Sequence, residues 1–263
     1  MEHQRSVQAL LIDLDGVLYV DNVPLAGAVN AIVEIKHSGL ECRFLTNSST
    51  HSRQDVALKL KGLGFEISAD QIFAAPYAAR LYLESLAYKK CRYIVSKSVM
   101  GEFDWVVNNA EHTTHIVIGD IGEDWNYQLM NDIFNDLLSG AELVAIHKNR
   151  FWQTGRGLKL DIGAFVAALE YGSNKPARVF GKPSKEFFDL ALADMGIFNE
   201  NVIMVGDDID SDIIGAMNVG IKTVLCKTGK FRESYFVKSD ICPDYIVDSI
   251  ASLPSLIEAI NES

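Results

Sequence analysis

The sequence predicts an α/β fold with a parallel β-sheet core and a smaller α/β domain inserted into the chain. Short apolar segments with strand character alternate with segments of helical periodicity along its 263 residues. Polar residues follow four of the apolar segments, at the strand ends where ligands gather in parallel α/β sheets. One interval between two of these ends is far longer than a strand–helix–strand connection requires, so it leaves room for a second domain.

The predicted strands are short and apolar, and helical segments separate them. They cover residues 8–12, 42–45, 93–95, 115–118, 143–146, 178–180, 202–205 and 222–225. As an example of a helix, Ile213, Ile214 and Met217 have helical spacing, and Gly220 follows as a favoured helix end. The chain has no internal repeats or low-complexity tracts, so the domain limits have to come from the spacing of its motifs.

Composition and charge exclude several classes of protein. Hydrophobic residues make up 48% of the chain, enough for a packed core, and the formal charge of −11 would repel nucleic acid and anionic membranes. The first apolar run is too short for a signal peptide, and no run reaches the length of a membrane span. Cys42 and Cys226 lie in apolar segments, so we expect buried reduced thiols. These features predict a cytoplasmic protein with no nucleic-acid or membrane partner.

Two pairs of acidic residues follow predicted strands. Asp13 and Asp15 come after an apolar strand, and residues at i and i+2 of an extended segment point the same way. Asp207 and Asp208 follow a second strand. Mg²⁺ in proteins typically takes one or two carboxylates, waters and a substrate phosphate. The two strand ends are therefore candidates for a magnesium site, although either pair alone is equally typical of a turn or a helix cap.

Two further strand ends carry groups suited to binding phosphate. Thr46 and Asn47 can donate a hydroxyl and an amide hydrogen to phosphoryl oxygens, just before a helix predicted to start near Ser52. Lys182 precedes Pro183, whose fixed φ angle restrains the backbone there. Taken singly, these residues are also typical of a helix cap and of a solvated lysine. Four such strand ends in one α/β chain are much harder to explain as coincidence.

The four segments read DLDGVLY, LTNSS, GKP and GDDIDSD, and they span residues 13–212. Together they resemble the motif set of the haloacid dehalogenase-like (HAD-like) hydrolase superfamily, which implies a Rossmann-like catalytic core. The segment VFGKPSKEFF and the position of the inserted domain resemble the NagD-like branch of that superfamily. The second aspartate of the first motif, Asp15, favours phosphate chemistry, because the dehalogenases of the superfamily lack an acid there.

The resemblance implies a role for each residue of the chemical step. Asp13 is expected to be the nucleophile that forms an aspartyl-phosphate, and Asp15 the general acid and base. Thr46, Asn47 and Lys182 are expected to hold the phosphoryl oxygens. A transferred phosphoryl group needs mainly positioning and positive charge, which agrees with this set.

The resemblance also implies a magnesium cofactor. The carboxylates of Asp13 and Asp207 and the main-chain carbonyl of Asp15 are its expected ligands. Asp208 and Asp212 are expected to orient the ligands without binding the metal themselves. This arrangement would give an acidic protein the local positive charge that an anionic substrate requires.

The spacing of the motifs locates the inserted domain. Thr46 follows Asp13 by 33 positions, room for one helix and a return strand, whereas Lys182 follows Asn47 by 135 positions. Counting one helix after Asn47 and another near residues 75–86 places the start of the insertion after the second. The prediction is therefore a catalytic core of residues 1–87 and 178–263 and a cap domain of residues 88–177.

The cap is expected to determine which phosphate compound is bound, and residues 147–161 form its most polar loop. Lys148 or Arg150 in that loop could contact an anionic group, although a solvated basic loop is the plainer interpretation. Phe151 and Trp152 could stack on a substrate ring or simply pack the domain. The resemblance further implies a homodimer formed through the cap.

The predicted function is Mg²⁺-dependent hydrolysis of a small phosphorylated metabolite through an aspartyl-phosphate on Asp13. One alternative is phosphate transfer within a sugar, but the enzymes of the superfamily that do this carry a cap between the first two motifs, where this chain has no room. Another alternative is a catalytically silent interaction protein, which the intact acidic, hydroxyl and lysine positions disfavour. The sequence leaves the substrate open.

Overall fold

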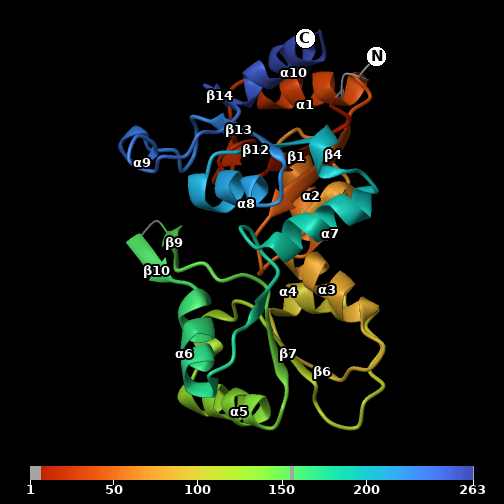
Figure 1. The fold of residues 1–263 in the computed structure, drawn as a ribbon, viewed down its shortest axis with the longest axis vertical. Coiled ribbons are helices and arrows are strands. Elements are labelled where there is room, and N and C mark those ends of the chain that lie inside the picture. The colour runs from red at the N-terminus through yellow and green to blue at the C-terminus, as the bar shows by residue number, and fades with distance from the viewer. Residues whose placement is uncertain (1–6, 155–156, 263) are drawn as a thin grey trace. The chain divides into compact units, whose positions relative to one another are not determined.

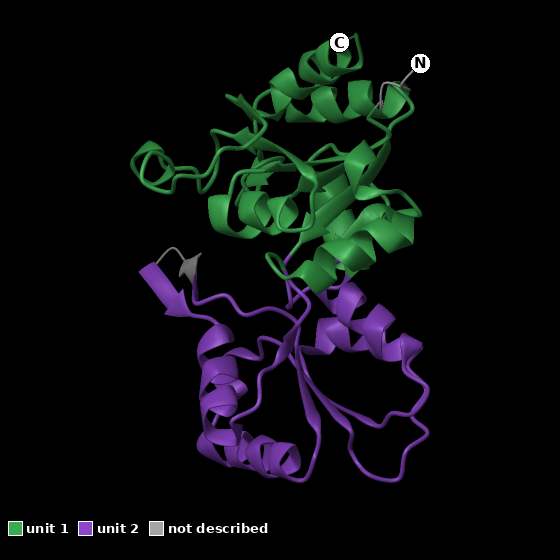
Figure 2. Ribbon diagram, viewed as in Figure 1, with its two compact units in different colours: residues 1–46, 53–73, 182–263 green, residues 47–52, 74–181 purple. Residues whose placement is uncertain are grey.

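The computed structural model describes residues 7–154 and 157–262, and it divides them into two compact units. Figure 2 colours the two units separately. The first unit holds the described residues up to 46 together with 53–73 and 182–262, and the second holds 47–52 and most of 74–181. The chain therefore passes between the units several times, and each unit is assembled from segments distant in sequence.

A six-stranded sheet forms the centre of the first unit, in the order β14-β13-β12-β1-β4-β5. Every neighbouring pair from β14 to β4 is parallel. The strands are β1 (Ala9–Asp13), β4 (Glu41–Thr46), β5 (Ile72–Ala74), β12 (Val202–Gly206), β13 (Lys222–Cys226) and β14 (Tyr245–Val247). All residues of β1 and β12 are buried, as is typical of strands covered by helices on both faces. The predicted α/β fold with a parallel sheet is confirmed.

Helices cover the two faces of this sheet, with α1 and α10 together on one face and α7 and α8 on the other (Figure 1). The helices of the unit are α1 (Ala28–His37), α2 (Arg53–Gly62), α7 (Lys185–Met195), α8 (Ile214–Met217), α9 (Glu233–Phe236) and α10 (Leu253–Glu262), with the single turns η1 (Ala69–Gln71), η4 (Asn199–Asn201) and η6 (Ile250–Ser252). A π-helical turn, η5 (Ile209–Ile213), leads into α8, and β2 (Tyr19–Val20) and β3 (Val23–Pro24) form a small hairpin. Ser184 caps α7 by accepting the Phe187 amide, and Gly196 ends it in the left-handed conformation.

The second unit is a smaller α/β structure with a four-stranded parallel sheet in the order β11-β8-β7-β6. Its strands are β6 (Cys91–Ile94), β7 (His115–Ile118), β8 (Glu142–Ala145) and β11 (Arg178–Val179), and a separate antiparallel hairpin joins β9 (Phe151–Thr154) to β10 (Gly157–Leu160). Its helices are α3 (Ala75–Ser85), α4 (Lys97–Met100), α5 (Tyr127–Leu138) and α6 (Gly163–Ser173), with the turns η2 (Gly101–Phe103) and η3 (Gly122–Asp124). Residues of β7, β8, α5 and α6 build its apolar core.

The boundaries between the two compact units differ from the predicted domain boundaries at residues 87/88 and 177/178. Helix α3 and strand β11 both belong to the second unit. The reason is packing: β11 pairs with β8, and Tyr82 of α3 stacks on Phe180 and donates a hydrogen bond to Glu142. The assignment of a catalytic core and a cap to these units stays a prediction.

The described chain shows two further properties that bear on the sequence analysis. None of its helices combines the length and the apolar character needed to cross a lipid bilayer. Cys42 and Cys226 are buried free thiols, as expected, and burial raises the pKa of Cys42 to about 11.

Candidate active site

Two carboxylates stand at and just beyond the end of β1, in different surroundings. Asp13 is the last residue of the strand and is buried, whereas Asp15 is exposed. The Tyr19 hydroxyl donates a hydrogen bond to Asp15 at 3.2 Å, and burial together with this carboxylate raises the pKa of Tyr19. Gly16 follows with a φ of 94°, a conformation that glycine tolerates best. The turn thus buries one carboxylate and leaves the other accessible.

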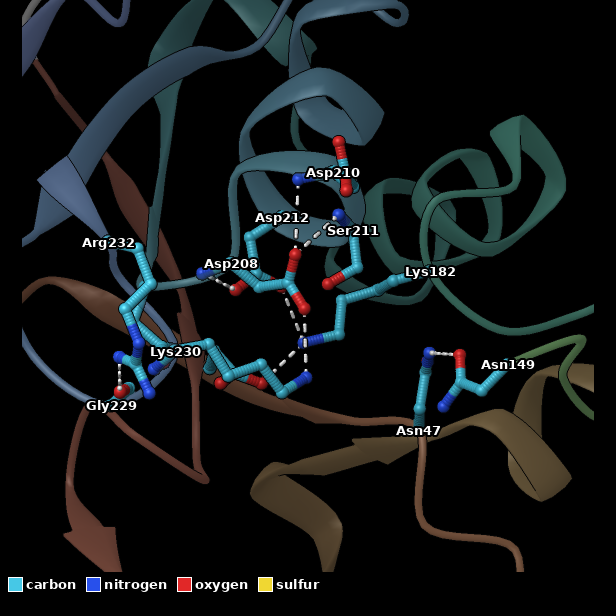
Figure 3. Close-up of polar contacts among 12 residues, drawn as sticks. Asn47, Asn149, Lys182, Asp208, Asp210, Ser211, Asp212, Gly229, Lys230 and Arg232 are labelled. Carbon is cyan, nitrogen blue, oxygen red and sulfur yellow. Dashed lines mark hydrogen bonds and ion pairs between the residues drawn. The ribbon is translucent and has the colours of Figure 1, made fainter. Parts of the chain in front are cut away.

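Lys182 places a buried ammonium group against two carboxylates. Its Nζ donates to Asp13. It also donates to Asp212 at 2.7 Å, as Figure 3 shows. Burial alone would lower the pKa of Lys182, but the charges of the two carboxylates outweigh it and hold the pKa above its ordinary value. Lys182 is therefore charged and supplies the buried positive charge that an anionic ligand beside Asp13 requires.

Three aspartates gather around this lysine. Asp13, Asp207 and Asp212 each offer a carboxylate oxygen, and these atoms all lie within 4.8 Å of one another. Burial, followed by the charges of the neighbouring carboxylates, raises the pKa of Asp207 to about 8, and burial likewise raises the pKa of Asp212 to about 7. The cluster holds more negative charge than Lys182 alone neutralises, so a bound cation would stabilise its ionised form.

Asp207 shows where such a cation would fit. Its Oδ2 atom accepts a hydrogen bond from the main-chain N–H of Lys230 at 2.5 Å. Its Oδ1 atom is buried and has no hydrogen-bond partner among the residues that the structure describes. Buried carboxylate oxygens without a partner are costly, and hard cations such as Mg²⁺ bind through oxygen. The carboxylates of Asp13 and Asp207 therefore fit a divalent metal ion.

Asp208 and Asp212 have distinct partners. Asp208 Oδ1 accepts the amide hydrogens of Asp210 and Ser211 at 3.1 and 3.2 Å, which caps η5, and Oδ2 pairs with Lys230 at 2.8 Å. Although burial opposes it, Lys230 and these hydrogen bonds hold the pKa of Asp208 below its usual value. Asp212 accepts from Lys182 and from the Asp208 amide. Asp212 thus lies within the carboxylate cluster, and its expected role in orienting the metal ligands stays a prediction.

Thr46 and Asn47 are neighbours in sequence but belong to different units. Thr46 ends β4 in the first unit and is buried, and β4 runs parallel to β1 with Leu45 opposite Asp13. The carboxyl ends of these two strands therefore coincide. Asn47 belongs to the second unit, where its side-chain amide lies 3.5 Å from the Asn149 side-chain oxygen. Its expected contact with phosphate stays a prediction.

The basic residues expected to contact substrate, Lys148 and Arg150, differ in their surroundings. Lys148 Nζ pairs with Glu170 of α6 at 2.5 Å, whereas Arg150 is exposed. Phe151 is about half exposed at the start of β9, and the Trp152 side chain lies outside the described residues. Both side chains are exposed, and Lys148 differs in holding an ion pair with Glu170.

Lys230 is a residue of this site that the motif analysis did not single out. Besides pairing with Asp208, Lys230 places a positive charge that partly offsets the burial that raises the pKa of Asp13 and Asp207. A signal was available, because Lys230 follows the end of β13, and β13 is the parallel neighbour of β12. Any polar residue in that position lies at the same edge of the sheet as Asp207.

Comparison with known proteins agrees with this geometry. A family model described as haloacid dehalogenase-like hydrolase matches residues 10–106, and one described as HAD-hydrolase-like matches residues 179–253. The chain is 39% identical over 232 residues to haloacid dehalogenase-like hydrolase domain-containing protein 2 of Mus musculus, covering 88% of each chain. It is 37% identical over 262 residues to phospholysine phosphohistidine inorganic pyrophosphate phosphatase of Bos taurus, covering 97% of this chain and 96% of the relative.

Solved structures show the same architecture. NagD from E. coli K-12 superimposes with a TM-score of 0.86 at 24% identity over 94% of this chain and 98% of its own, a likeness of fold. A glycerol phosphate phosphatase from Mycobacterium tuberculosis, solved in complex with magnesium, superimposes with a TM-score of 0.83 at 25% identity over 97% of this chain and 80% of its own. The resemblance found in the sequence is confirmed, and the chain belongs to the haloacid dehalogenase-like hydrolase family.

Proposed function

We propose that this protein is a Mg²⁺-dependent phosphatase that hydrolyses a small phosphorylated metabolite through an aspartyl-phosphate on Asp13. The observation that carries the proposal is the buried Asp13 carboxylate, paired with Lys182 and grouped with Asp207, whose Oδ1 atom has no partner among the described residues. Phosphatases among the relatives and structural neighbours support the reaction class.

The proposed reaction has two displacements. In the first, a carboxylate oxygen of Asp13 bonds to phosphorus while the bond to the leaving oxygen breaks and Asp15 gives that oxygen its proton. In the second, Asp15 takes a proton from water, and the water oxygen displaces the Asp13 carboxylate from phosphorus to release inorganic phosphate. The exposure of Asp15 and its hydrogen bond from Tyr19 suit a group that exchanges protons with substrate and water.

Lys182 and Thr46 are proposed to hold the phosphoryl oxygens, with Asn47 as a third donor. Lys182 already offsets the charge of Asp13, which would otherwise repel an approaching phosphate. Asp212 keeps the Lys182 ammonium in place through its own hydrogen bond. These residues therefore supply the positioning and positive charge that phosphoryl transfer requires.

The metal is proposed to bind the carboxylates of Asp13 and Asp207 and the main-chain carbonyl of Asp15. When bound, Mg²⁺ would offset negative charge on the phosphoryl group and help to align it with Asp13. Asp208 holds the turn that carries Asp212, so its proposed role is to support the site.

The substrate is expected to be small. The name of the Bos taurus relative mentions phospholysine, phosphohistidine and pyrophosphate. A substrate screen therefore has to include compounds with phosphorus–nitrogen and pyrophosphate bonds as well as phosphate esters. Contact of Arg150 or Lys148 with substrate, the homodimer and the cytoplasmic location stay predictions from the sequence.

Substitution of the nucleophile tests the proposal. With Asp13→Asn, Mg²⁺-dependent phosphate release from p-nitrophenyl phosphate should fall by about a thousandfold or more, because covalent catalysis is lost. Asp240→Asn is the matched control, since Asp240 is an exposed aspartate whose left-handed conformation asparagine tolerates. A loss of less than about tenfold in Asp13→Asn would contradict the assignment of Asp13 as nucleophile.

A further inference from the structure

Residues 228–230 contact Asp207 and the neighbouring Gly16, although none of them belongs to the four motifs. They follow β13, whose residue Leu225 pairs with Gly206 of β12. Because the two strands are parallel, residues 228–230 and Asp207 lie beyond the carboxyl ends of neighbouring strands. The Thr228 hydroxyl donates to the Gly16 carbonyl at 2.5 Å, and the Lys230 amide donates to Asp207 Oδ2 at 2.5 Å. The segment is therefore tied both to the turn after β1 and to the carboxylate after β12.

Gly16 and Gly229 have no side chains, and the Asp207 carboxylate occupies the space that side chains there would fill. A Cβ atom on Gly229 would lie 2.5 Å from the Gly16 Cα atom, and closer still to Asp207 Oδ2. A Cβ atom on Gly16 would also overlap Asp207 Oδ2. Real Cβ atoms do not approach other atoms so closely, so either side chain would force the Asp207 carboxylate to move.

The two oxygens of Asp207 are consequently different. Oδ2 lies against the bare backbones of Gly16 and Gly229 and accepts a hydrogen bond from the Lys230 amide. Oδ1 is buried and has no hydrogen-bond partner among the described residues. This hydrogen bond and the close packing of the two glycines both oppose rotation of the carboxylate, so Oδ1 is held in one direction.

We propose that residues 228–230 are a positioning element that fixes the Asp207 carboxylate by Oδ2 and so presents Oδ1 to the divalent cation. The inference rests on the proposed function, because that function assigns Asp207 to the metal. The Lys230 side chain extends the same effect, since its ammonium pairs with Asp208 at 2.8 Å and anchors the segment at a second point. Partners behind metal ligands commonly alter metal affinity by ten- to a hundredfold.

Substitution of Gly229 by alanine tests the inference, with Gly196→Ala as the matched control. Both glycines have positive φ angles, 49° and 66°, so both substitutions carry a similar backbone cost, but a Cβ atom on Gly196 meets nothing within 4 Å. Mg²⁺ is titrated into each protein without substrate and followed by calorimetry. We expect binding to weaken by about tenfold or more in Gly229→Ala and to stay within about twofold of wild type in Gly196→Ala.

Thr228→Val is the second variant, because it removes the hydroxyl that bonds to Gly16 and keeps the shape of the side chain. It should weaken Mg²⁺ binding roughly threefold, about the value of one hydrogen bond. The Mg²⁺ concentration for half-maximal turnover should rise by the same factor, excess Mg²⁺ should restore turnover, and the KM for p-nitrophenyl phosphate at saturating Mg²⁺ should not change.

The outcomes separate this inference from the proposed function. Wild-type Mg²⁺ affinity in Gly229→Ala and Thr228→Val would overturn the inference, even if Asp13→Asn abolishes turnover. Weakened Mg²⁺ binding in both variants, with Asp13→Asn still active, would support the inference and contradict the nucleophile. If Gly229→Ala does not fold, the Thr228→Val titration decides the matter.

Discussion

Each unit of this protein contains a buried cluster of polar side chains, and the two clusters differ in how fully they are satisfied. In the first unit, Lys182 faces Asp13 and Asp212, and Asp207 keeps one oxygen without a described partner. In the second unit, His147 Nε2 lies 2.9 Å from the Ser49 hydroxyl, and its Nδ1 accepts the Asn149 amide.

The second cluster completes its own hydrogen bonds. Because Nδ1 of His147 is an acceptor, Nε2 carries the hydrogen of the neutral ring and donates it to Ser49. Burial lowers the pKa of His147 and outweighs the opposing charges of Asp161 and Asp120. Asp161 itself accepts the Ile162 amide at 2.7 Å. A cluster with satisfied hydrogen bonds stabilises its unit, whereas crowded buried carboxylates, one with an oxygen that has no described partner, indicate a ligand site.

Removal of the buried ammonium should have the largest effect. Lys182→Met leaves two buried carboxylates without their cation, so we expect turnover of p-nitrophenyl phosphate to fall by about a thousandfold. Lys185→Met is the control, because Lys185 is an exposed lysine that pairs with Asp189 on the surface of α7. A variant that keeps more than about a tenth of wild-type turnover would remove the functional distinction between the clusters.

Substitution within the second cluster should change stability and its dependence on pH. Because the pKa of His147 is lowered from 6.5 in the folded protein, the unfolded chain binds a proton more readily. His147 therefore contributes fully to the free energy of unfolding above pH 6.5, and this contribution is lost as the pH falls through the lower pKa of the folded protein. Hydrogen-exchange protection of β7 and β8 should thus decrease on acidification in the wild-type protein and decrease less in His147→Gln.

The exposed His51 provides the control for this measurement. His51→Gln should keep the wild-type response of β7 and β8 to pH. In His147→Gln, the loss of the His147 hydrogen bonds should also lower the free energy of unfolding by about 1–3 kcal/mol at neutral pH. Equal responses to acid in His147→Gln and wild type would contradict a lowered pKa of His147 in the folded protein.

The surface ion pair of the second unit should have the smallest effect. Lys148 is exposed and pairs with Glu170, so Lys148→Met should change the free energy of unfolding by about 0.5 kcal/mol or less. The measurement is urea denaturation at low and high salt. A loss above about 2 kcal/mol would show that Lys148 belongs to a stronger network than the comparison assumes.

The part of the site that sequence reasoning could identify lies directly at strand ends. Asp13, Thr46 and Asp207 follow apolar segments whose parallel pairing brings their carboxyl ends to one edge. Lys230 was missed because it lies four positions beyond its strand, after a turn whose path the sequence does not specify. The pairing of Asp212 with Lys182 was missed for a similar reason, since η5 turns Asp212 toward the cluster.

The boundaries of the two units also depend partly on local sequence and partly on contacts between distant residues. Motif spacing predicts a long insertion between Asn47 and Lys182, and the compact units divide the chain at other residues, with α3 and β11 in the second unit. Their places are set by contacts with distant residues, such as those of Tyr82 with Phe180 and Glu142 and the pairing of β11 with β8.

By itself, the sequence determined the α/β fold, the family and the strand ends that carry Asp13, Thr46 and Asp207, because local apolar patterns specify which segments are buried and pair as strands. Lys182 follows β11, a strand of the second unit, so its pairing with Asp13 depends on tertiary structure. Only the tertiary structure decided which oxygen of Asp207 is free and which residues hold the other. That choice depends on the close approach of Gly16 and Gly229, which lie more than two hundred positions apart in the chain. Contacts between such distant segments are set by packing in three dimensions, and no local pattern records them.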